Sequence, residues 1–205
     1  MQTIDAWLDE LASSAPAPGG GAAAALSASM GASLICMVCS LTIGKPKYAA
    51  FDEQLTAVLG EAQQVRLAAL GLVDEDARAF TAVMAAYKLP RADDAERATR
   101  TAAIQQALAA AAEVSLRIAE LGQRVIELAG EITAGANANV VSDVAVAASA
   151  GRAALQSALV TVDVNLASMT DERALTAISL RAGRCEQAIG RADAVVGEVR
   201  KKIAR

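Results

Sequence analysis

The chain has 205 residues, enough for one compact domain, and its composition of 54% hydrophobic but only 2% aromatic residues predicts closely packed, alanine-rich helices. Its net charge of −4 argues against a nucleic-acid partner, because binding to phosphates needs a basic surface. The chain contains no histidine, so acid–base chemistry has to come from Asp, Glu, Lys, Tyr or Cys, and no metal centre is expected.

The first predicted helix follows Thr3, whose side chain can cap a helix N-terminus. The apolar residues of this helix fall on one face: Ile4, Trp7, Leu8 and Leu11. Residues 13–18, with two prolines, end the helix. The N-terminus has no basic region, so a secretory signal is not expected.

The next predicted helix is the uncharged stretch from Gly19 to Ile43, which by length alone could cross a membrane. Its large residues form a single stripe: Leu26, Met30, Leu34, Met37 and Leu41. The other faces are Ala, Ser and Gly, which gain little from transfer into lipid, and no aromatic residue flanks the stretch. We therefore predict a helix buried among other helices, with small residues where its neighbours approach, and not a membrane span.

Two of the three cysteines, Cys36 and Cys39, have C-x-x-C spacing inside this stretch, and the third is Cys185. A redox motif belongs at an exposed helix start next to a βαβ unit, and the sequence shows no such unit. We interpret the cysteines as packed, reduced thiols and expect a cytoplasmic protein.

Four further helices are predicted after a polar break at 42–48, over residues 49–88, 91–128, 140–169 and 171–202. Leu89-Pro90 separates the first two of them, a loop at 130–139 precedes the third, and Thr170 or Asp171 caps the last. The prediction is an all-α fold: one domain over 1–205, a compact bundle of about five to six helices with a glycine-rich start to the central helix. Its surplus of apolar surface favours a homo-oligomer.

Three consecutive acids, Asp74, Glu75 and Asp76, lie in the helix predicted at 49–88. The first two are spaced to pair with Arg78 on a solvated face. Asp76 falls instead on the apolar face, with Leu72, Val73, Phe80, Val83 and Tyr87. A carboxylate there either finds hydrogen-bond donors or has a raised pKa, which suits a general acid or base at neutral pH. Asp76 is thus a candidate catalytic residue, and the alternative is a structural acid bonded to a neighbouring helix.

Two other polar groups are candidates for binding a ligand. Where a loop enters the helix at 140–169, the chain has Asn137, Asn139, Ser142 and Asp143, and helix capping does not need all four. Lys45, Lys47 and Tyr48 follow the uncharged helix, either as a solvated loop or as a cationic patch for an anionic tail.

Three glycines follow Pro18 at the start of the uncharged helix: Gly19, Gly20 and Gly21. Glycines permit close backbone approach, here to another helix or to a ligand. The N–H groups of a helix N-terminus favour an anionic or carbonyl-bearing ligand. This is not a Walker loop, because the closing Gly-Lys-Ser/Thr is missing.

Taken together, these segments resemble the cyclodeaminase/cyclohydrolase family of tetrahydrofolate enzymes. The matching pieces are Pro16–Gly21, Leu41–Tyr48, Asp74–Phe80 followed by Leu89-Pro90, Asn137–Asp143 and Val164–Leu166. They occur in the order of the family and at about its spacing, over nearly the whole chain. The chain departs from the family pattern at Ala136, Thr161 and Asp163, among other positions.

The resemblance implies an all-α homodimer with a folate pocket near the subunit interface, no permanently bound cofactor and a folate derivative as substrate. The catalytic aspartate of the family falls on Asp76. The resemblance also implies substrate-binding roles for Pro18, Gly19, Gly20, Gly21, Lys45, Lys47, Tyr48, Phe80, Asn137, Asn139, Ser142, Asp143 and Asn165. In this scheme the glycine backbone lets the pterin ring approach, the Asn, Ser and Asp side chains hold the ring, and the lysines meet the glutamate tail.

The activity implied by the resemblance is hydrolysis of 5,10-methenyltetrahydrofolate to 10-formyltetrahydrofolate, with Asp76 as general base. Standalone bacterial members of the family look like methenyltetrahydrofolate cyclohydrolases, whereas the same domain fused to a formiminotransferase acts as a formiminotetrahydrofolate cyclodeaminase that releases ammonia. Cyclodeamination therefore stays open as an alternative. A non-catalytic folate-binding or structural helical dimer is a third hypothesis, and it predicts no open cavity beside Asp76.

Overall fold

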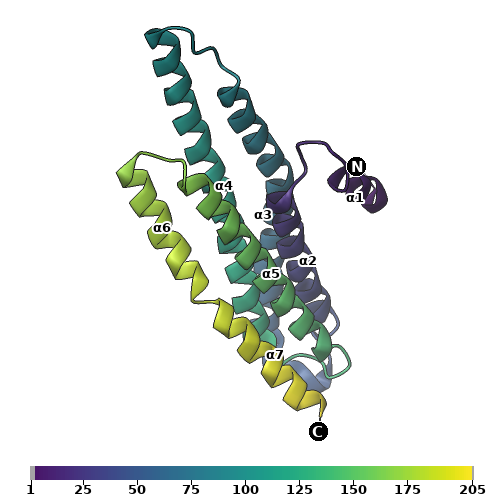
Figure 1. Cartoon of the computed structure of the whole chain (residues 1–205). Coiled ribbons are helices and arrows are strands. Elements are labelled where there is room, and N and C mark those ends of the chain that lie inside the picture. The colour runs from purple at the N-terminus through teal and green to yellow at the C-terminus, as the bar shows by residue number, and fades with distance from the viewer. Residues whose placement is uncertain (1–2, 205) are drawn as a thin grey trace.

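A computed structural model describes residues 3–204, which contain seven α-helices, one 3₁₀ helix and no strand. The elements are α1 (Ile4–Leu11), α2 (Gly20–Ser40), η1 (Pro46–Phe51), α3 (Asp52–Tyr87), α4 (Asp94–Ile132), α5 (Val141–Leu166), α6 (Glu172–Glu186) and α7 (Ile189–Ile203). Figure 1 shows an elongated bundle in which the long helices α3 and α4 extend past the others at one end. The predicted all-α fold is confirmed.

Polar side chains begin three of the helices. The Thr3 hydroxyl accepts the N–H of Ala6, and Asp93 accepts the N–H of Glu96 at 2.8 Å. Asp171 accepts two backbone N–H groups at the start of α6. These caps satisfy N–H groups that have no partner within their own helix.

The last predicted helix is wrong in one respect, because it is two helices, α6 and α7, with a break at Gln187 and Ala188. At the break the Ala188 N–H bonds the Cys185 carbonyl three residues back, at 2.9 Å. Cys185 and Ala188 are both buried in the same apolar cluster. The change of direction lets α6 pack on α4 while α7 packs mainly on α5.

Helix α2 packs against α3, α4 and α5, as a core helix does, and its small residues face these neighbours. A Cβ at Gly31, for example, would lie 2.7 Å from the Val125 side chain. The stripe of large residues points the other way: Met30 is 51% exposed and Leu41 is 43% exposed. The prediction that helices surround α2 is therefore wrong for one face. Close approach of the neighbouring helices needs the small residues, which leaves the stripe of Met30, Met37 and Leu41 outside, while Ile35 and Val38 are buried in the core.

Helices α4 and α5 share the largest helix–helix interface and approach each other at two glycines. A Cβ at Gly122 would lie 2.8 Å from the backbone nitrogen of Leu155, and a Cβ at Gly151 would lie 2.9 Å from the Gly122 carbonyl oxygen. Only glycine permits two helix backbones to come this close.

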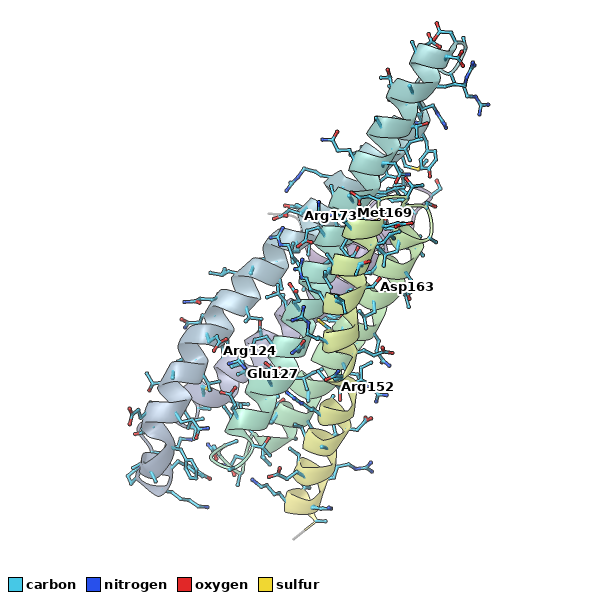
Figure 2. All side chains as sticks on the ribbon, turned by 90° about the vertical axis from the view of Figure 1, so that its left-hand side faces the viewer. Arg124, Glu127, Arg152, Asp163, Met169 and Arg173 are labelled. Carbon is cyan, nitrogen blue, oxygen red and sulfur yellow. The ribbon has the colours of Figure 1, made fainter. Side chains whose placement is uncertain are left out.

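Charged side chains tie the outer helices to α4. Arg124 on α4 binds Glu61 of α3 in a bidentate ion pair, with one N–O distance of 2.7 Å, and it also pairs with Glu127 and Glu131. Figure 2 shows Arg124 and Glu127 close together on this side of the bundle. Arg181 ties α6 to α4 in the same way, through Glu113 and Glu120.

Two helices, α2 and α5, are long and apolar enough to cross a membrane by length and composition alone. They pack against each other and against α4 inside the bundle. Core helices of water-soluble proteins have the same composition, and in α2 and α5 many of the small residues are fully buried.

Candidate active site

A cavity of about 390 Å³ lies at the N-terminal end of α2. Its walls come from the segment before α2 and from α2, α3, α4 and α5. The lining residues are Pro16, Ala17, Gly19, Gly20, Gly21, Asp76, Ala79, Phe80, Val83, Tyr87, Leu108, Ala111, Ser115, Val160, Thr161, Val164, Asn165 and Ser168. This size and mixture of apolar and polar residues is typical of a small-molecule site.

Asp76 extends from α3 onto the first turn of α2, where Gly21 faces it. A Cβ at Gly21 would lie only 2.1 Å from the Oδ1 atom of Asp76 and 2.8 Å from its Oδ2 atom. The predicted close approach at the glycines is therefore, in this chain, an approach to the Asp76 carboxylate. Any larger residue at position 21 would displace that carboxylate.

Burial raises the pKa of Asp76, while a hydrogen bond from the backbone N–H of Ala22 lowers it by a smaller amount. Ala22 is the third residue of α2, and the N-cap residue Gly19 has no side chain that could accept such an N–H. Asp76 thus caps α2 from a neighbouring helix, with its charge at the positive end of the helix dipole. The structural acid and the candidate catalytic acid are the same group, because the capping carboxylate also lines the cavity.

The rest of the cavity is mainly apolar. Phe80 and Tyr87 are partly exposed on the α3 side, and hydroxyl and amide groups of Ser115, Thr161 and Asn165 lie on the opposite helices. The Asn165 amide N–H donates to the Thr161 carbonyl at 2.9 Å. Among residues 3–204, the lining of the cavity includes one carboxylate and no Lys or Arg. A flat, positively charged ring system suits such a lining, since the only formal charge is negative.

The acids next to Asp76 do not make the expected pairs. Glu75 binds Arg117 of α4 at 2.7 Å rather than Arg78. The α3–α4 packing brings this arginine closer than the one on the same helix, so a contact between helices replaces the predicted local pair.

The second group of predicted residues lies at the opposite end of α2. There the Tyr48 hydroxyl accepts the Ala138 N–H at 3.0 Å and lies 3.4 Å from the Asn137 Oδ1 atom. This N–H and the nearby Lys47 and Lys45 lower the pKa of Tyr48. Lys45 and Lys47 are themselves exposed.

Asn137 is only 5% exposed, and protein groups occupy its amide. Its Nδ2 atom donates to the Leu41 carbonyl at 3.0 Å, and its Oδ1 atom accepts the Asn139 N–H at 3.1 Å. Asn137 therefore joins the α4–α5 loop to the end of α2. The neighbouring Asn139 and Ser142 are exposed, and Asp143 is half-buried.

Within one chain, the structure does not bring the two predicted groups around a single pocket. Asp76, Phe80, Asn165 and the three glycines line the cavity, with Pro18 in the segment that leads to them. The second group comprises Lys45, Lys47, Tyr48, Asn137, Asn139, Ser142 and Asp143, and it lies beyond Ser40. The 21 residues of α2 separate the groups by about 30 Å.

Apart from Asn165, sequence reasoning gave no site role to the part of the cavity wall that comes from α4, α5 and the turn after α5: Leu108, Ala111, Ser115, Val160, Thr161, Val164 and Ser168. These residues recur at helical spacing, but core residues recur at the same spacing. On α3, by contrast, the apolar face around Asp76 already contained Val83 and Tyr87, which do line the cavity.

The third hypothesis, a helical dimer without an active site, predicted no open cavity next to Asp76. The cavity is present and Asp76 is part of its wall. This observation favours an enzyme over a purely structural protein.

Comparison with known proteins gives concordant results. A family model described as formiminotransferase-cyclodeaminase matches residues 3–183. The methenyltetrahydrofolate cyclohydrolase of Methylorubrum extorquens is 46% identical over 170 residues, which cover 83% of this chain and 82% of that protein. The formimidoyltransferase-cyclodeaminase of Rattus norvegicus is 34% identical over 170 residues, but this match covers only 31% of that longer protein.

A solved structure of formiminotetrahydrofolate cyclodeaminase from Thermotoga maritima has the same fold, with a TM-score of 0.84 at 25% identity. The similarity covers 98% of this chain and 95% of that one. Because the family model matches most of the chain, and a relative of similar length shares nearly half of the aligned residues, the chain belongs to the formiminotransferase-cyclodeaminase family.

Proposed function

We propose that this protein is an enzyme that hydrolyses 5,10-methenyltetrahydrofolate to 10-formyltetrahydrofolate in the cavity beside Asp76. The observation that carries the proposal is a single half-buried carboxylate in a mainly apolar cavity of about 390 Å³ that has no basic residue in its described lining. The substrate is a cation with a flat ring system, so its charge and shape are complementary to this lining. The named activity of the Methylorubrum relative supports the same conclusion.

The reaction needs one group that accepts a proton. Water attacks the electrophilic bridging carbon, a C–O bond forms, and Asp76 takes a proton from the water. In the resulting carbinolamine, the hydroxyl loses its proton as the carbonyl forms, and the bond from this carbon to N5 breaks. The electron pair stays on N5, which takes the proton held by Asp76, while the hydroxyl proton passes to solvent and the formyl group stays on N10. Overall one water is consumed and one proton is released.

The environment of Asp76 suits both parts of this role. Burial raises its pKa, and a base with a pKa nearer the working pH accepts a proton more readily in the transition state. Its negative charge also stabilises the cationic substrate, and the mainly apolar walls of the cavity strengthen this interaction.

The test is the absorbance decay of methenyltetrahydrofolate with Asp76→Asn. Asparagine keeps an oxygen that can accept the Ala22 N–H, so the α2 cap is preserved while the base is lost. We expect the rate to fall roughly 10²–10⁴-fold. The matched control is Asp74→Asn, a change of the same kind on the exposed side of the same helix, which should leave the rate unchanged. Near-normal turnover by a folded Asp76→Asn variant would show that Asp76 is not the base.

Cyclodeamination of 5-formiminotetrahydrofolate is the second candidate function, and the names of the rat and Thermotoga relatives favour it. That reaction needs a proton donor for the departing nitrogen, which protonated Asp76 could supply. Supplying both substrates separately and measuring ammonia and 10-formyltetrahydrofolate distinguishes the two activities.

The protein also acts, in this proposal, as a cytoplasmic homodimer that uses the outer face of α2 and α5. This face, defined here as the α2–α5 face, has exposed apolar residues at Met30, Met37, Val146, Val160 and Val164. Helix α2 carries no charged residue at all. A large exposed apolar surface is costly to leave in water, which favours self-association.

A two-fold axis through the middle of this face, near Met30, would make the two α2 helices antiparallel. Each two-fold contact uses the same patch twice, so the glycine end of one α2 then lies beside the Ser40 end of the other. Asn139, Ser142, Asp143, Lys45 and Lys47 of one subunit would then adjoin the cavity of the other. In this proposal each site is composite: the cavity residues of one subunit and the second residue group of the other subunit, which are far apart in one chain, lie side by side.

Sedimentation velocity tests this assembly. Met30→Arg introduces a charge at the centre of the proposed interface and should give a folded monomer with little activity. Leu180→Arg, on α6 and outside this face, is the matched control because Leu180 is also an exposed apolar residue. A fully active Met30→Arg monomer would rule out the composite site.

A further inference from the structure

Helix α1 is a short amphipathic helix that the rest of its own chain leaves largely uncovered. None of its residues is buried, Ile4 is 76% exposed and Leu8 is 49% exposed. Figure 1 shows α1 to one side of the bundle, joined to the start of α2 by an extended segment. An amphipathic helix of eight residues has little stability alone, so its apolar face needs a surface to pack on.

The charged side chains of this region are all acidic. Residues 1–44 include Asp5, Asp9 and Glu10 but no Lys or Arg. At the other end of the α2–α5 face, the first basic residues are Lys45 and Lys47, and no ion pair involves either of them within residues 3–204. Opposite charges therefore lie beyond the two ends of the uncharged helix α2.

In the antiparallel dimer described above, this charge pattern is self-complementary. The start of α2 in one subunit lies beside the end of α2 in the other, where Met37 and Leu41 are exposed and Lys45 follows. The segment from Ala12 to Gly19 can span up to about 26 Å when extended, so α1 can reach this end of the second copy.

We propose that α1 is an arm that docks on a second copy of this chain, at the end of its α2. The apolar side of α1, with Ile4, Trp7 and Leu8, covers Leu41 of the partner subunit, and Asp5 and Asp9 lie opposite Lys45 of the partner subunit. An apolar centre with a charged rim is the usual composition of a protein interface. The inference rests on the dimer in the proposed function, but not on the reaction.

The position of the linking segment gives the arm a role in the site. Pro16 and Ala17 of this segment line the cavity, so docking of α1 on the partner fixes that part of the cavity wall. The arm would thus order the wall of its own site through contact with the other subunit.

The test uses Trp7, the single tryptophan of the chain, as a reporter. In the full-length dimer we expect its emission to be shifted to shorter wavelength, and its quenching by acrylamide to be weaker, than in the Met30→Arg monomer. Circular dichroism confirms that both proteins are folded. Equal quenching of Trp7 in the dimer and the monomer would overturn the arm and leave the dimer intact. Failure of the wild-type chain to dimerise would overturn the dimer and the arm together.

Two substitutions on α1 make the test specific. Leu8→Asp places a carboxylate on the docking side and should weaken the dimer about tenfold, since the buried leucine area is lost. Ala6→Asp adds the same charge on the opposite side of the helix and should leave the dimer affinity within about twofold of the wild type. Equal effects of the two changes would overturn the assigned docking side.

A charge exchange tests the polar part of the contact. Lys45→Glu alone should weaken the dimer, and Asp5→Lys in the same chain should restore part of the affinity, since each then meets an opposite charge across the interface. Strictly additive losses would overturn the pairing of these two residues.

Discussion

Replacing Gly21 by alanine tests directly whether the contact between α2 and Asp76 sets up the active site. The added Cβ would lie 2.1 Å from the Asp76 Oδ1 atom, whereas ordinary van der Waals contact begins at 3.4 Å, so the carboxylate has to move by about 1.3 Å. A displacement on the order of 1 Å in a catalytic group can lower the rate about 10²-fold. We therefore expect kcat/KM for methenyltetrahydrofolate to fall by about this factor.

The matched control is Gly71→Ala, five residues before Asp76 on α3. A Cβ at Gly71 meets no atom within 4 Å, so this change should leave the rate unchanged. It should also stabilise the protein, by up to about 1 kcal/mol, because alanine favours the helix interior. The assay is the absorbance decay of the substrate, with circular dichroism to confirm that each variant is folded. A folded Gly21→Ala variant with wild-type kcat/KM would refute the reasoning, because the carboxylate position would then not matter.

Three other predictions concern stability. Because burial raises the pKa of Asp76, keeping this residue ionised in the folded protein costs free energy at pH values above that pKa. Asp76→Asn should therefore raise the free energy of unfolding, measured in urea at neutral pH. The gain should vanish in acid, where the wild-type carboxyl is already protonated. Asn137→Ala leaves the Leu41 carbonyl without its donor and should cost about 1–3 kcal/mol in the same measurement. Arg124→Met leaves Glu61 and two other carboxylates without their shared cation and should lower the free energy of unfolding by about 1–2 kcal/mol. This loss should be smaller in high salt, because salt screens the charges. A loss independent of salt would show that packing, not charge, is responsible.

Local patterns account for the parts of the fold that could be predicted from the sequence. Thr3 and Asp171 are helix caps because their side chains accept nearby N–H groups, which needs no information from the rest of the chain. The break between α6 and α7 could not be predicted in this way. Gln187 and Ala188 are compatible with a helix, and the break comes from the packing of two helices on different neighbours.

The orientation of α2 is a second feature that could not be predicted from the sequence. Periodicity groups Met30 and Leu41 on one stripe, but it does not say which side of the helix faces the core. Small residues make the tightest contacts of α2 with its neighbours, so the stripe that contains Met30 and Leu41 remains outside, although Ile35 and Val38 of the same helix are buried. The same reasoning explains why they are available for an interface between subunits.

The candidate site was also only partly predictable. Asp76 could be singled out because a carboxylate is unusual on an apolar helix face, and Gly21 because three successive glycines are unusual at a helix start. Their contact with each other could not be predicted, because it depends on how α2 and α3 pack. The distance between Gly21 and Lys45, at the two ends of α2, follows from helix length alone, yet only the fold shows that Lys45 and Asp76 lie apart in one chain.

The cap that Asp76 provides for α2 links the strength of the base to the integrity of a helix end. The Ala22 N–H lowers the pKa of Asp76, so the ionised carboxylate in turn holds the first turn of α2 in place. When Asp76 takes up a proton, this attraction weakens, although the carbonyl oxygen of the neutral carboxyl can still accept the Ala22 N–H. Each proton transfer at the site therefore also changes how strongly the first turn of α2 is capped.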